Sequence, residues 1–243
     1  TLKLFNKQLE IFKQRGEDEL LSIAFELEFN FIYVLASMEQ KGIKIDVKLL
    51  KEYKDRSLIY LNELTQNIYE ACGESFNINS PKQLGVILFE KLGLASSKKT
   101  KTGYSTDESV LESLKNEHKV VPLLLKYREA FKLHSTYIEP LLELGLKDSE
   151  NRVFSSFLHT GTTTGRLSSK NPNLQNIPVG TFSDIQIRRA FIAQDGYKLV
   201  GVDYSQIELR LLAHFSKDEA LVNAFKQDLD IHLQTAIKIF GED

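Results

Sequence analysis

Apolar residues recur at helical spacing through much of the first 146 positions. Those from Leu20 to Met38 predict a helix that ends near Lys41-Gly42, and Ile43-Lys44-Ile45 predicts a short extended connection. Asp46 is expected to cap a long helix over roughly 47–71. Its apolar face is predicted to hold Leu50, Tyr53, Leu58, Leu61, Leu64 and Ile68. Helix pairs of this length suit a projecting arm.

Capping residues predict three further helices. The segment 80–83 (SPKQ) combines an N-cap serine, a proline at the first helical position and a glutamine able to complete a capping box. Ser105 and Glu108 repeat the capping-box spacing and predict a second start. Pro122 is expected to open a third helix, which runs toward Leu146.

Beyond Asn151 the pattern changes to short strands and turns. Strands are expected at Val153–Leu158, Ala190–Ala193 and Lys198–Val202. The last two would be joined through Asp195-Gly196, a dipeptide favoured in hairpins. The predicted fold class is therefore α+β, mainly α, with short antiparallel strands and flanking helices.

Composition indicates a globular protein without a general attraction to nucleic acid. The chain has 243 residues, 42% of them hydrophobic, and a formal net charge of -2. Any surface that binds nucleic acid must therefore come from locally clustered Lys and Arg. Glu26, Glu28 and Asn30 interrupt the apolar run 23–38, so no membrane span is expected. Cys72 is the single cysteine; it is expected to be a core residue, and a cytoplasmic setting is natural.

Asp203 follows the apolar run 197–202 and precedes Ile207, Leu211 and Leu212 at helical spacing. It is therefore predicted at a strand-to-helix join. Two interpretations are open from the residues alone: the aspartate caps the following helix, or its carboxylate is available to a metal ion. A simple cap does not require the polar residues that surround it.

The string DYSQIELR at 203–210 closely resembles the first catalytic motif of family A DNA polymerases, the group that includes bacterial DNA polymerase I. Other segments resemble the same family in the same order. They are FNINSPKQL at 76–84, KTKTGYST at 99–106, KLHSTYIEPL at 132–141, TTTGRLSSKNPNLQNIP at 162–178, RRAFIA at 188–193 and DIHLQTAIKIFG at 230–241. The resemblance covers nearly the whole chain.

This resemblance implies a domain organisation. Residues 1–45 would be an N-terminal helical segment at the palm base, 46–146 a helical thumb, and 147–243 the first part of the palm, leading into the fingers. The family pattern continues with a fingers helix and a second catalytic carboxylate that this sequence does not contain. We therefore expect a fragment of a larger polymerase that is inactive in isolation.

The resemblance also implies a metal and nucleotide site. Nucleotidyl transfer uses two Mg²⁺ ions, and the carboxylate of Asp203 and the backbone carbonyl of Tyr204 would be metal ligands. Glu208 resembles the steric gate against a ribose 2′-hydroxyl, although composition alone would make it a capping or solvated residue. His232 is open between a structural role and the nucleotide phosphates. The implied nucleotide-binding residues are Ser205, Gln206, Ile207, Glu208 and His232.

DNA contacts are expected at three places. Arg166 resembles the arginine that touches the primer terminus, and its planar fork can donate to minor-groove acceptors. Asn173, Gln175 and Asn176 could act similarly, although Asn-Pro-Asn is also an ordinary turn signal. Phosphate contacts are expected from the basic cluster Lys98, Lys99 and Lys101, which could instead be a solvated loop, and from Asn77 and Asn79 beside a helix N-terminus.

Two positions depart from the family pattern. His134 and Gln186 stand where basic residues are common in the family, so the DNA contacts that the family makes at these two positions stay open for this chain.

The function implied is template-directed DNA synthesis in replication and repair. Primer-template DNA and deoxynucleoside triphosphates would be the partners, with no membrane association and no implied oligomer. Two alternatives are a catalytically inactive module that binds primer-template DNA and a purely structural scaffold. The combination of Asp203, Glu208 and Arg166 favours the polymerase.

Overall fold

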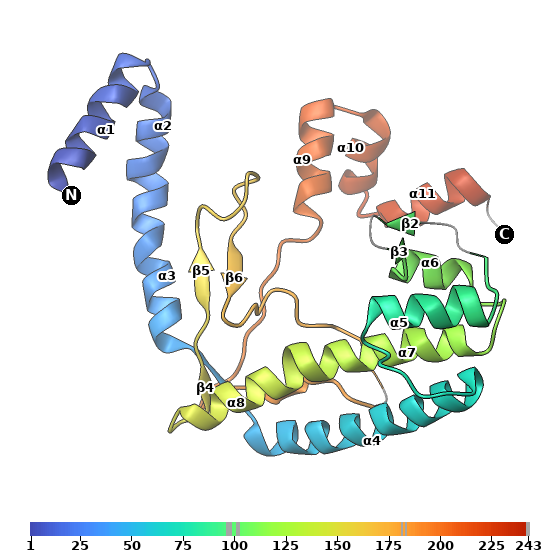
Figure 1. Cartoon of the computed structure of the whole chain (residues 1–243). Coiled ribbons are helices and arrows are strands. Elements are labelled where there is room, and N and C mark those ends of the chain that lie inside the picture. The colour runs from blue at the N-terminus through green and yellow to red at the C-terminus, as the bar shows by residue number, and fades with distance from the viewer. Residues whose placement is uncertain (96–98, 101–102, 181, 183, 242–243) are drawn as a thin grey trace. The chain divides into compact units, whose positions relative to one another are not determined.

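The computed structural model describes residues 1–95, 99–100, 103–180, 182 and 184–241, with the side chains of 99, 100 and 238 excepted (Figure 1). The chain divides into two units, Thr1–Tyr197 and Lys198–Asp243. Helices dominate both, and the strands are short and antiparallel. The predicted α+β, mainly α class is therefore confirmed.

The first unit begins with helices α1 (Leu2–Gln14), α2 (Asp18–Ile23), a π-helical turn η1 (Ala24–Glu28) and α3 (Phe29–Lys41). The predicted helix 20–38 is thus confirmed, and it ends at Gly42, whose φ of 57° suits glycine. The side-chain amide of Asn30 donates to the carbonyl oxygens of Phe25 and Glu26 at 3.2 and 2.9 Å. It satisfies backbone acceptors where the helix changes its hydrogen-bond pattern.

Contrary to the expectation from its polar interruptions, the stretch Asp18–Lys41 is long and apolar enough to cross a membrane by length and composition alone, and only 6% of its apolar window is buried within the described residues. The acidic residues that interrupt it have partners within the first unit. The Glu28 carboxylate contacts Nε2 of His159, and Glu39 accepts a hydrogen bond from the backbone N–H of Phe157 at 2.6 Å. These carboxylates tie the helix to the hairpin described below.

Helix α4 (Val47–Cys72) begins as predicted, with the Asp46 carboxylate accepting from the N–H of Leu49 at 2.9 Å. The prediction that Leu58 is buried is wrong, because Leu58 is 40% exposed and its neighbour Ser57 is buried instead. The buried residues of α4 follow one another at intervals of three or four positions, and this series passes through position 57. Residue 58 is rotated by about 100° around the helix axis and so points away from the buried face. The buried stripe is Leu50, Tyr53, Ser57, Leu61, Leu64 and Ile68.

The chain continues through α5 (Pro81–Gly85), η2 (Val86–Lys91), β2 (Lys99–Thr100), β3 (Gly103–Tyr104), α6 (Glu108–Ser113), α7 (Val120–Lys132), η3 (Leu133–Ile138) and α8 (Glu139–Lys147). Ser80 caps α5 as predicted, whereas the Gln83 side chain accepts from the N–H of Asn77. The capping box predicted at Ser105 is wrong. Asp107 is the N-cap residue, and the Ser105 hydroxyl accepts from the N–H of Asp107, so it forms a local turn before the helix.

Two hydrophobic clusters lie along α4. The first joins α4 to α5, η2, α6 and α7, and it contains Leu61, Leu64, Ile68, Leu84, Leu88, Leu111 and Leu124 among other residues. The second joins α4 to η3, α8 and the sheet, and it contains Ile45, Leu50, Tyr53, Ile138, Leu141, Val153 and Ile187 among others. Burial of these side chains is the main favourable term in folding.

Three short strands pair antiparallel in the order β4-β1-β7. They are β1 (Ile43–Ile45), β4 (Arg152–Val153) and β7 (Phe191–Ile192), which follows the 3-10 turn η4 (Ile187–Ala190). The register pairs Ile43 with Val153 and Ile45 with Phe191. The predicted strand 153–158 is divided, because β5 (Ser156–Leu158) leaves this sheet and pairs with β6 (Ser168–Lys170) as a hairpin.

The strand predicted at 198–202 is wrong. These residues have no ladder partner within the described residues, and Val200 and Val202 are 82% and 92% exposed. A strand requires a neighbour for its N–H and C=O groups, and local sequence cannot supply one. The predicted hairpin at Asp195-Gly196 is absent for the same reason.

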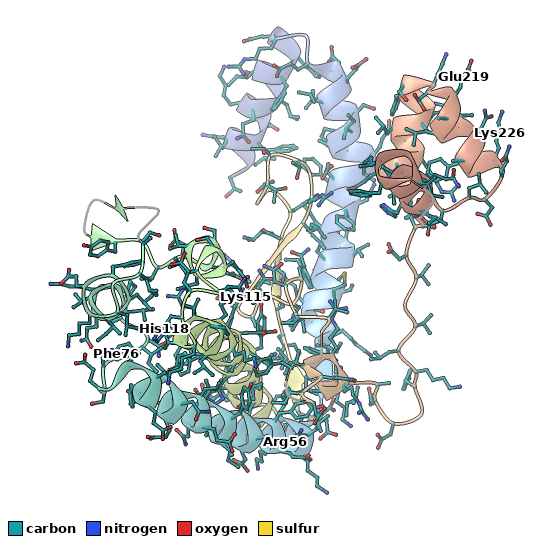
Figure 2. All side chains as sticks on the ribbon, turned by 90° about the vertical axis from the view of Figure 1, so that its right-hand side faces the viewer. Arg56, Phe76, Lys115, His118, Glu219 and Lys226 are labelled. Carbon is teal, nitrogen blue, oxygen red and sulfur yellow. The ribbon has the colours of Figure 1, made fainter. Side chains whose placement is uncertain are left out.

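The second unit consists of α9 (Ile207–Ser216), α10 (Glu219–Lys226) and α11 (Ile231–Phe240). Glu219 and Lys226 mark the two ends of α10 (Figure 2). The Asp218 carboxylate caps α10 through the N–H of Leu221 at 2.9 Å. Asp230 caps α11 in the same way, so the starts of α10 and α11 each have a carboxylate acceptor.

A buried pair of serines supports the base of the β5–β6 hairpin. The hydroxyl oxygens of Ser155 and Ser169 lie 2.7 Å apart. Ser155 also donates to the carbonyl of Pro172 at 2.7 Å, and Ser169 accepts from the N–H of Leu174 at 3.0 Å. Because buried polar groups must be paired, these bonds fix the loop that follows β6.

A second buried polar contact links α4 to η3. The Ser57 hydroxyl lies 2.8 Å from Nδ1 of His134, and Nε2 of His134 lies 3.9 Å from the carboxylate of Glu139. That carboxylate accepts a hydrogen bond from Lys54 at 2.7 Å. Burial lowers the pKa of His134 from its ordinary value of 6.5; Glu139 raises it and Lys54 lowers it further, by smaller amounts.

Replacing Ser169 with alanine should destabilise the first unit. The change leaves the N–H of Leu174 without its acceptor and removes the contact to the Ser155 hydroxyl, which keeps only its backbone acceptors, at a cost of about 1–3 kcal/mol. Urea unfolding followed by circular dichroism measures this loss. Ser156→Ala is the matched control on β5, and an equal loss in both variants would contradict the role of the buried pair.

Acidification should destabilise the chain through His134. Because its pKa in the folded state lies below the ordinary 6.5, the unfolded chain binds the proton first. The neutral His134 therefore contributes its full share of the unfolding free energy above pH 6.5. This share is lost as pH falls from 6.5 through the lowered pKa of the folded state. The unfolding free energy should therefore fall more between pH 7 and pH 5 in the native chain than in His134→Gln, measured by urea titration at each pH. Parallel curves would disprove the assignment.

Candidate active site

The motif 203–210 lies in the second unit and passes from an extended segment into α9. Residues 198–204 are extended and exposed, and Asp203, Ser205 and Glu208 are all accessible to solvent. Gln206 takes the left-handed conformation, with φ of 52° and ψ of 40°, immediately before the helix begins at Ile207. The backbone therefore turns sharply within three residues of Asp203.

The interpretation of Asp203 as a helix cap is wrong. The N-cap position of α9 belongs to Gln206, and no side chain caps this helix. Asp203 lies three residues earlier, before the left-handed turn. Its carboxylate is exposed and satisfies no helix N–H, and its binding to a metal ion stays a prediction.

The oxygen donors at this position suit a hard divalent cation. Mg²⁺ prefers one or two carboxylates together with carbonyl, water and phosphate oxygens. Asp203 can offer its carboxylate, and Tyr204, which is 78% exposed, lies next to it. Within the described residues, no group of three or more His, Cys, Asp or Glu side chains could hold a metal ion.

The predicted nucleotide-binding residues occupy two helix starts. Gln206 precedes α9, and Ile207 and Glu208 lie in its first turn, where a carboxylate is favoured by the helix dipole. His232 lies in the first turn of α11. Its backbone N–H donates to the Asp230 carboxylate at 2.8 Å, so Asp230 fulfils the capping role and the exposed imidazole is not required for it.

Arg210 has a structural role that the sequence interpretation missed. Its Nε donates to the carbonyl oxygen of Ser205 at 2.9 Å, and its guanidinium carbon lies 4.6 Å from the centre of the Phe225 ring. The arginine was visible in the motif string. Its partner Phe225 is fifteen residues away, and no local pattern connects the two.

Arg166 lies in the connection between β5 and β6, in the first unit. Gly165 before it has a φ of 74°, which glycine adopts without strain. The Thr162 hydroxyl donates to the carbonyl oxygen of Arg166 at 2.7 Å and closes the turn. The Arg166 side chain is exposed at this turn.

The polar residues after the hairpin have structural bonds. The Asn173 side-chain oxygen accepts from the N–H of Gln175 at 3.0 Å, and the Gln175 amide donates to the carbonyl of Leu167 at 3.0 Å. The Tyr137 hydroxyl donates to the carbonyl of Asn176 at 2.7 Å. The turn interpretation of this segment is therefore supported, and DNA contact by these side chains stays a prediction.

The predicted phosphate contacts near α5 also have local partners. The Asn77 side-chain oxygen accepts from the N–H of Asn79 at 3.0 Å, and the Asn79 amide donates to the hydroxyl of Tyr127 at 3.1 Å. Lys98 and Lys101 lie outside the described residues, and for Lys99 only the backbone, in β2, is described. Arg128 donates to the carbonyl and hydroxyl oxygens of Thr106, just beyond β3.

His134 is 7% exposed and faces Ser57. His134 therefore has a structural role in this unit, and the sequence had already left a DNA contact at this position open. Gln186 is exposed, and its carbonyl accepts a long hydrogen bond of 3.5 Å from Tyr53.

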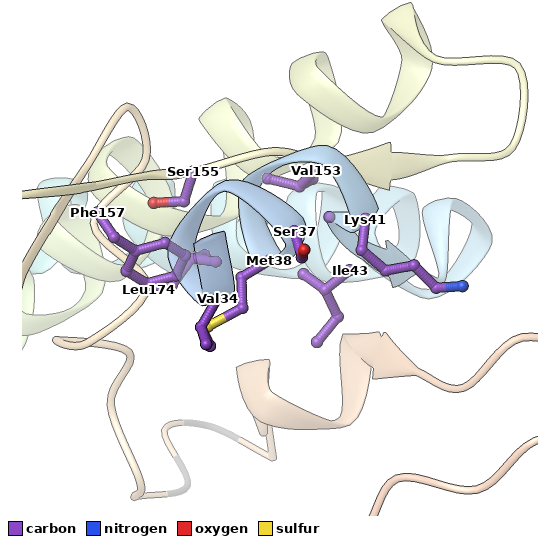
Figure 3. A pocket seen from close by; sticks show the side chains of 10 residues that line it. Val34, Ser37, Met38, Lys41, Ile43, Val153, Ser155, Phe157 and Leu174 are labelled. Atoms are coloured by element: carbon purple, nitrogen blue, oxygen red, sulfur yellow. The ribbon is translucent and has the colours of Figure 1, made fainter. Parts of the chain in front are cut away.

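An apolar pocket of about 680 Å³ opens between α3, β1, β4 and the hairpin (Figure 3). Its lining residues are Val34, Ser37, Met38, Lys41, Gly42, Ile43, Val153, Ser155, Phe157 and Leu174. None of the predicted catalytic or nucleotide-binding residues lines it, and no carboxylate does. The pocket therefore does not have the composition of a metal site.

Comparison with known proteins agrees with the motif evidence. Residues 47–243 match the model of DNA polymerase family A. The chain is 47% identical over 244 aligned residues to DNA polymerase I of Helicobacter pylori strain J99 and 49% identical over 236 to that of Bacillus subtilis strain 168. These alignments cover 100% and 97% of this chain but only 26% and 25% of the relatives, so the chain spans about a quarter of their length.

A solved structure supports the same relationship. The chain is similar to the POL domain of Pol1 from M. smegmatis, solved as a complex with DNA primer-template and dNTP, with a TM-score of 0.85 and 36% identity. The match covers 94% of this chain and 40% of that one. Sequence and fold agree, and the chain belongs to DNA polymerase family A.

Proposed function

We propose that this chain supplies part of the active site of a DNA polymerase that extends a primer by template-directed nucleotidyl transfer. The observation that carries the proposal is the exposed Asp203 carboxylate, which caps no helix and stands five residues before Glu208 in the family motif. Membership of DNA polymerase family A supports the reaction class.

Asp203 and the backbone carbonyl of Tyr204 would hold the metal. When bound, two Mg²⁺ ions lower the pKa of the primer hydroxyl and stabilise the leaving oxygen. The exposed carboxylate of Asp203 would be accessible to such ions. One carboxylate cannot fix two ions, so we expect the complete polymerase to supply at least one more.

Glu208 would act as a steric gate. It lies in the first turn of α9, five residues beyond Asp203, and its carboxylate would face the sugar of the nucleotide and would not bind the metal. Ser205, Gln206, Ile207 and His232 would complete the nucleotide side. A side chain that closely contacts the sugar excludes a 2′-hydroxyl because insertion of an extra atom into a packed site is costly.

The remaining parts would hold DNA. We propose residues 1–45 as the helical segment at the palm base, 46–146 as the thumb and 147–243 as the first part of the palm. Arg166 would contact the primer terminus, and thumb residues such as Asn77 and Lys99 would contact phosphates. Binding through these groups should weaken as salt concentration rises.

The parent enzyme would act on primer-template DNA and deoxynucleoside triphosphates, in replication and repair in the cytoplasm. The alternative is a catalytically inactive module that binds primer-template DNA. Primer extension separates the two: the complete polymerase should extend a primer with Mg²⁺, whereas this chain alone should not. DNA binding without extension by the complete protein would favour the alternative.

Asp203→Ala in the complete polymerase should reduce primer extension by about 10³-fold, because metal coordination contributes several kcal/mol and each 1.36 kcal/mol is tenfold in rate. Primer-template affinity, measured by fluorescence anisotropy, should stay within about twofold, since one exposed carboxylate contributes little to phosphate binding. Asp228→Asn, an exposed acidic residue of the same unit, is the control. Equal loss of DNA binding and extension would indicate a structural role.

Glu208→Ala should relax discrimination against ribonucleotides. Removing the side chain frees space that a 2′-hydroxyl can occupy, and the preference for deoxynucleotides should fall by about 10- to 100-fold, in line with an overpacking cost of about 1–3 kcal/mol. Single-nucleotide incorporation kinetics with each sugar measure the ratio. Glu219→Ala, which removes the same side chain from the first turn of α10 (Figure 2), should leave it unchanged. Unaltered selectivity in the Glu208 variant would refute the gate.

A further inference from the structure

Arg210 joins three segments of the second unit. It belongs to α9, its Nε donates to the carbonyl of Ser205 in the motif loop at 2.9 Å, and its guanidinium group lies over the Phe225 ring of α10 with a carbon-to-centroid distance of 4.6 Å. Both contacts lie within residues 198–243. A single side chain thus connects the loop that carries Asp203 to the helix pair α9–α10.

The loop needs such a connection because its own geometry is weakly determined. Residues 198–204 have no ladder partner within the described chain, and α9 has no side-chain cap at its N-terminus. Gln206 adopts the left-handed conformation that residues with a side chain take up only at a cost. The bond from Arg210 to Ser205 holds the backbone immediately before this turn.

Only arginine can make both contacts at once. The guanidinium group is planar, so Nε can donate in the plane while the flat face stacks on an aromatic ring. Lysine carries its donors on a single tetrahedral nitrogen without a face to stack. Lysine at this position would keep the positive charge but lose one contact or the other.

We infer that Arg210 is a positioning residue for the nucleotidyl-transfer reaction, because it fixes the loop on which the Asp203 carboxylate stands. This inference rests on the proposed function. Asp203 lies two residues before Ser205, so a shift of the Ser205 carbonyl moves the carboxylate. Misplacement by about 1 Å can reduce a rate by about 100-fold.

The test compares Arg210→Lys with the native complete polymerase. The turnover rate of primer extension should fall by about 10- to 100-fold, and the half-saturating Mg²⁺ concentration should rise. Primer-template affinity and the thermal unfolding midpoint should be unchanged. Phe225→Leu should show the same changes to a smaller extent, whereas Phe225→Tyr, which keeps an aromatic face, should behave as the native enzyme. Lys226→Ala, at the exposed end of α10 next to Phe225, is the matched control.

Hydrogen exchange on this chain alone separates the positioning role from the proposed function. Arg210→Lys should raise the exchange rate of the Ser205–Ile207 amides relative to those of α11. Unchanged exchange, or unchanged turnover and Mg²⁺ dependence in an active polymerase, would overturn the inference. If Asp203→Ala retained full activity, the proposed function would fail, and faster exchange at Ser205–Ile207 would still support Arg210 as the residue that holds the loop.

Discussion

The first unit depends on one constraint: the buried stripe of α4 serves two hydrophobic clusters in succession. Leu50 and Tyr53 belong to the cluster beside the sheet, and Leu61, Leu64 and Ile68 belong to the cluster under α5–α7. Ser57 stands between them and bonds to His134 instead of packing against apolar neighbours. A single rigid helix therefore sets the distance and the rotation between the two clusters.

Local signals predicted the helices of this arrangement because each is encoded by nearby residues. The Asp46 and Ser80 caps formed where the sequence places them, and the long apolar periodicities became α3, α4 and the α7–α8 region. The wrong predictions have a different cause, namely contacts that local sequence does not determine. The apolar segment 198–202 satisfies every local criterion for a strand, but a strand also needs a partner, and partnership is not a local property. The capping box at Ser105 did not form because its hydroxyl accepts from the N–H of Asp107, two residues on, and the helix begins only after Asp107.

The candidate site shows the same division between local and distant information. Asp203, Glu208 and Arg166 were recognised because they stand in continuous motifs. Ser155, Ser169 and Arg210 were not, because each acts through a partner that the fold brings near: Pro172, Leu174 and Phe225. Such residues touch no substrate in the proposed reaction. Ser155 and Ser169 hold the loop after β6, and Arg210 bonds to the backbone of the motif at Ser205.

The hydrogen bond from Tyr137 to Asn176 joins η3 to the segment that follows the hairpin. Tyr137 itself is part of the cluster beside the sheet, so its hydroxyl is carried on a side chain that packing holds in place. Any displacement of η3 along its axis must either stretch this bond or carry the backbone at Asn176 with it. The position of Asn176 is thus coupled to that of η3 through one hydrogen bond between a packed side chain and the backbone.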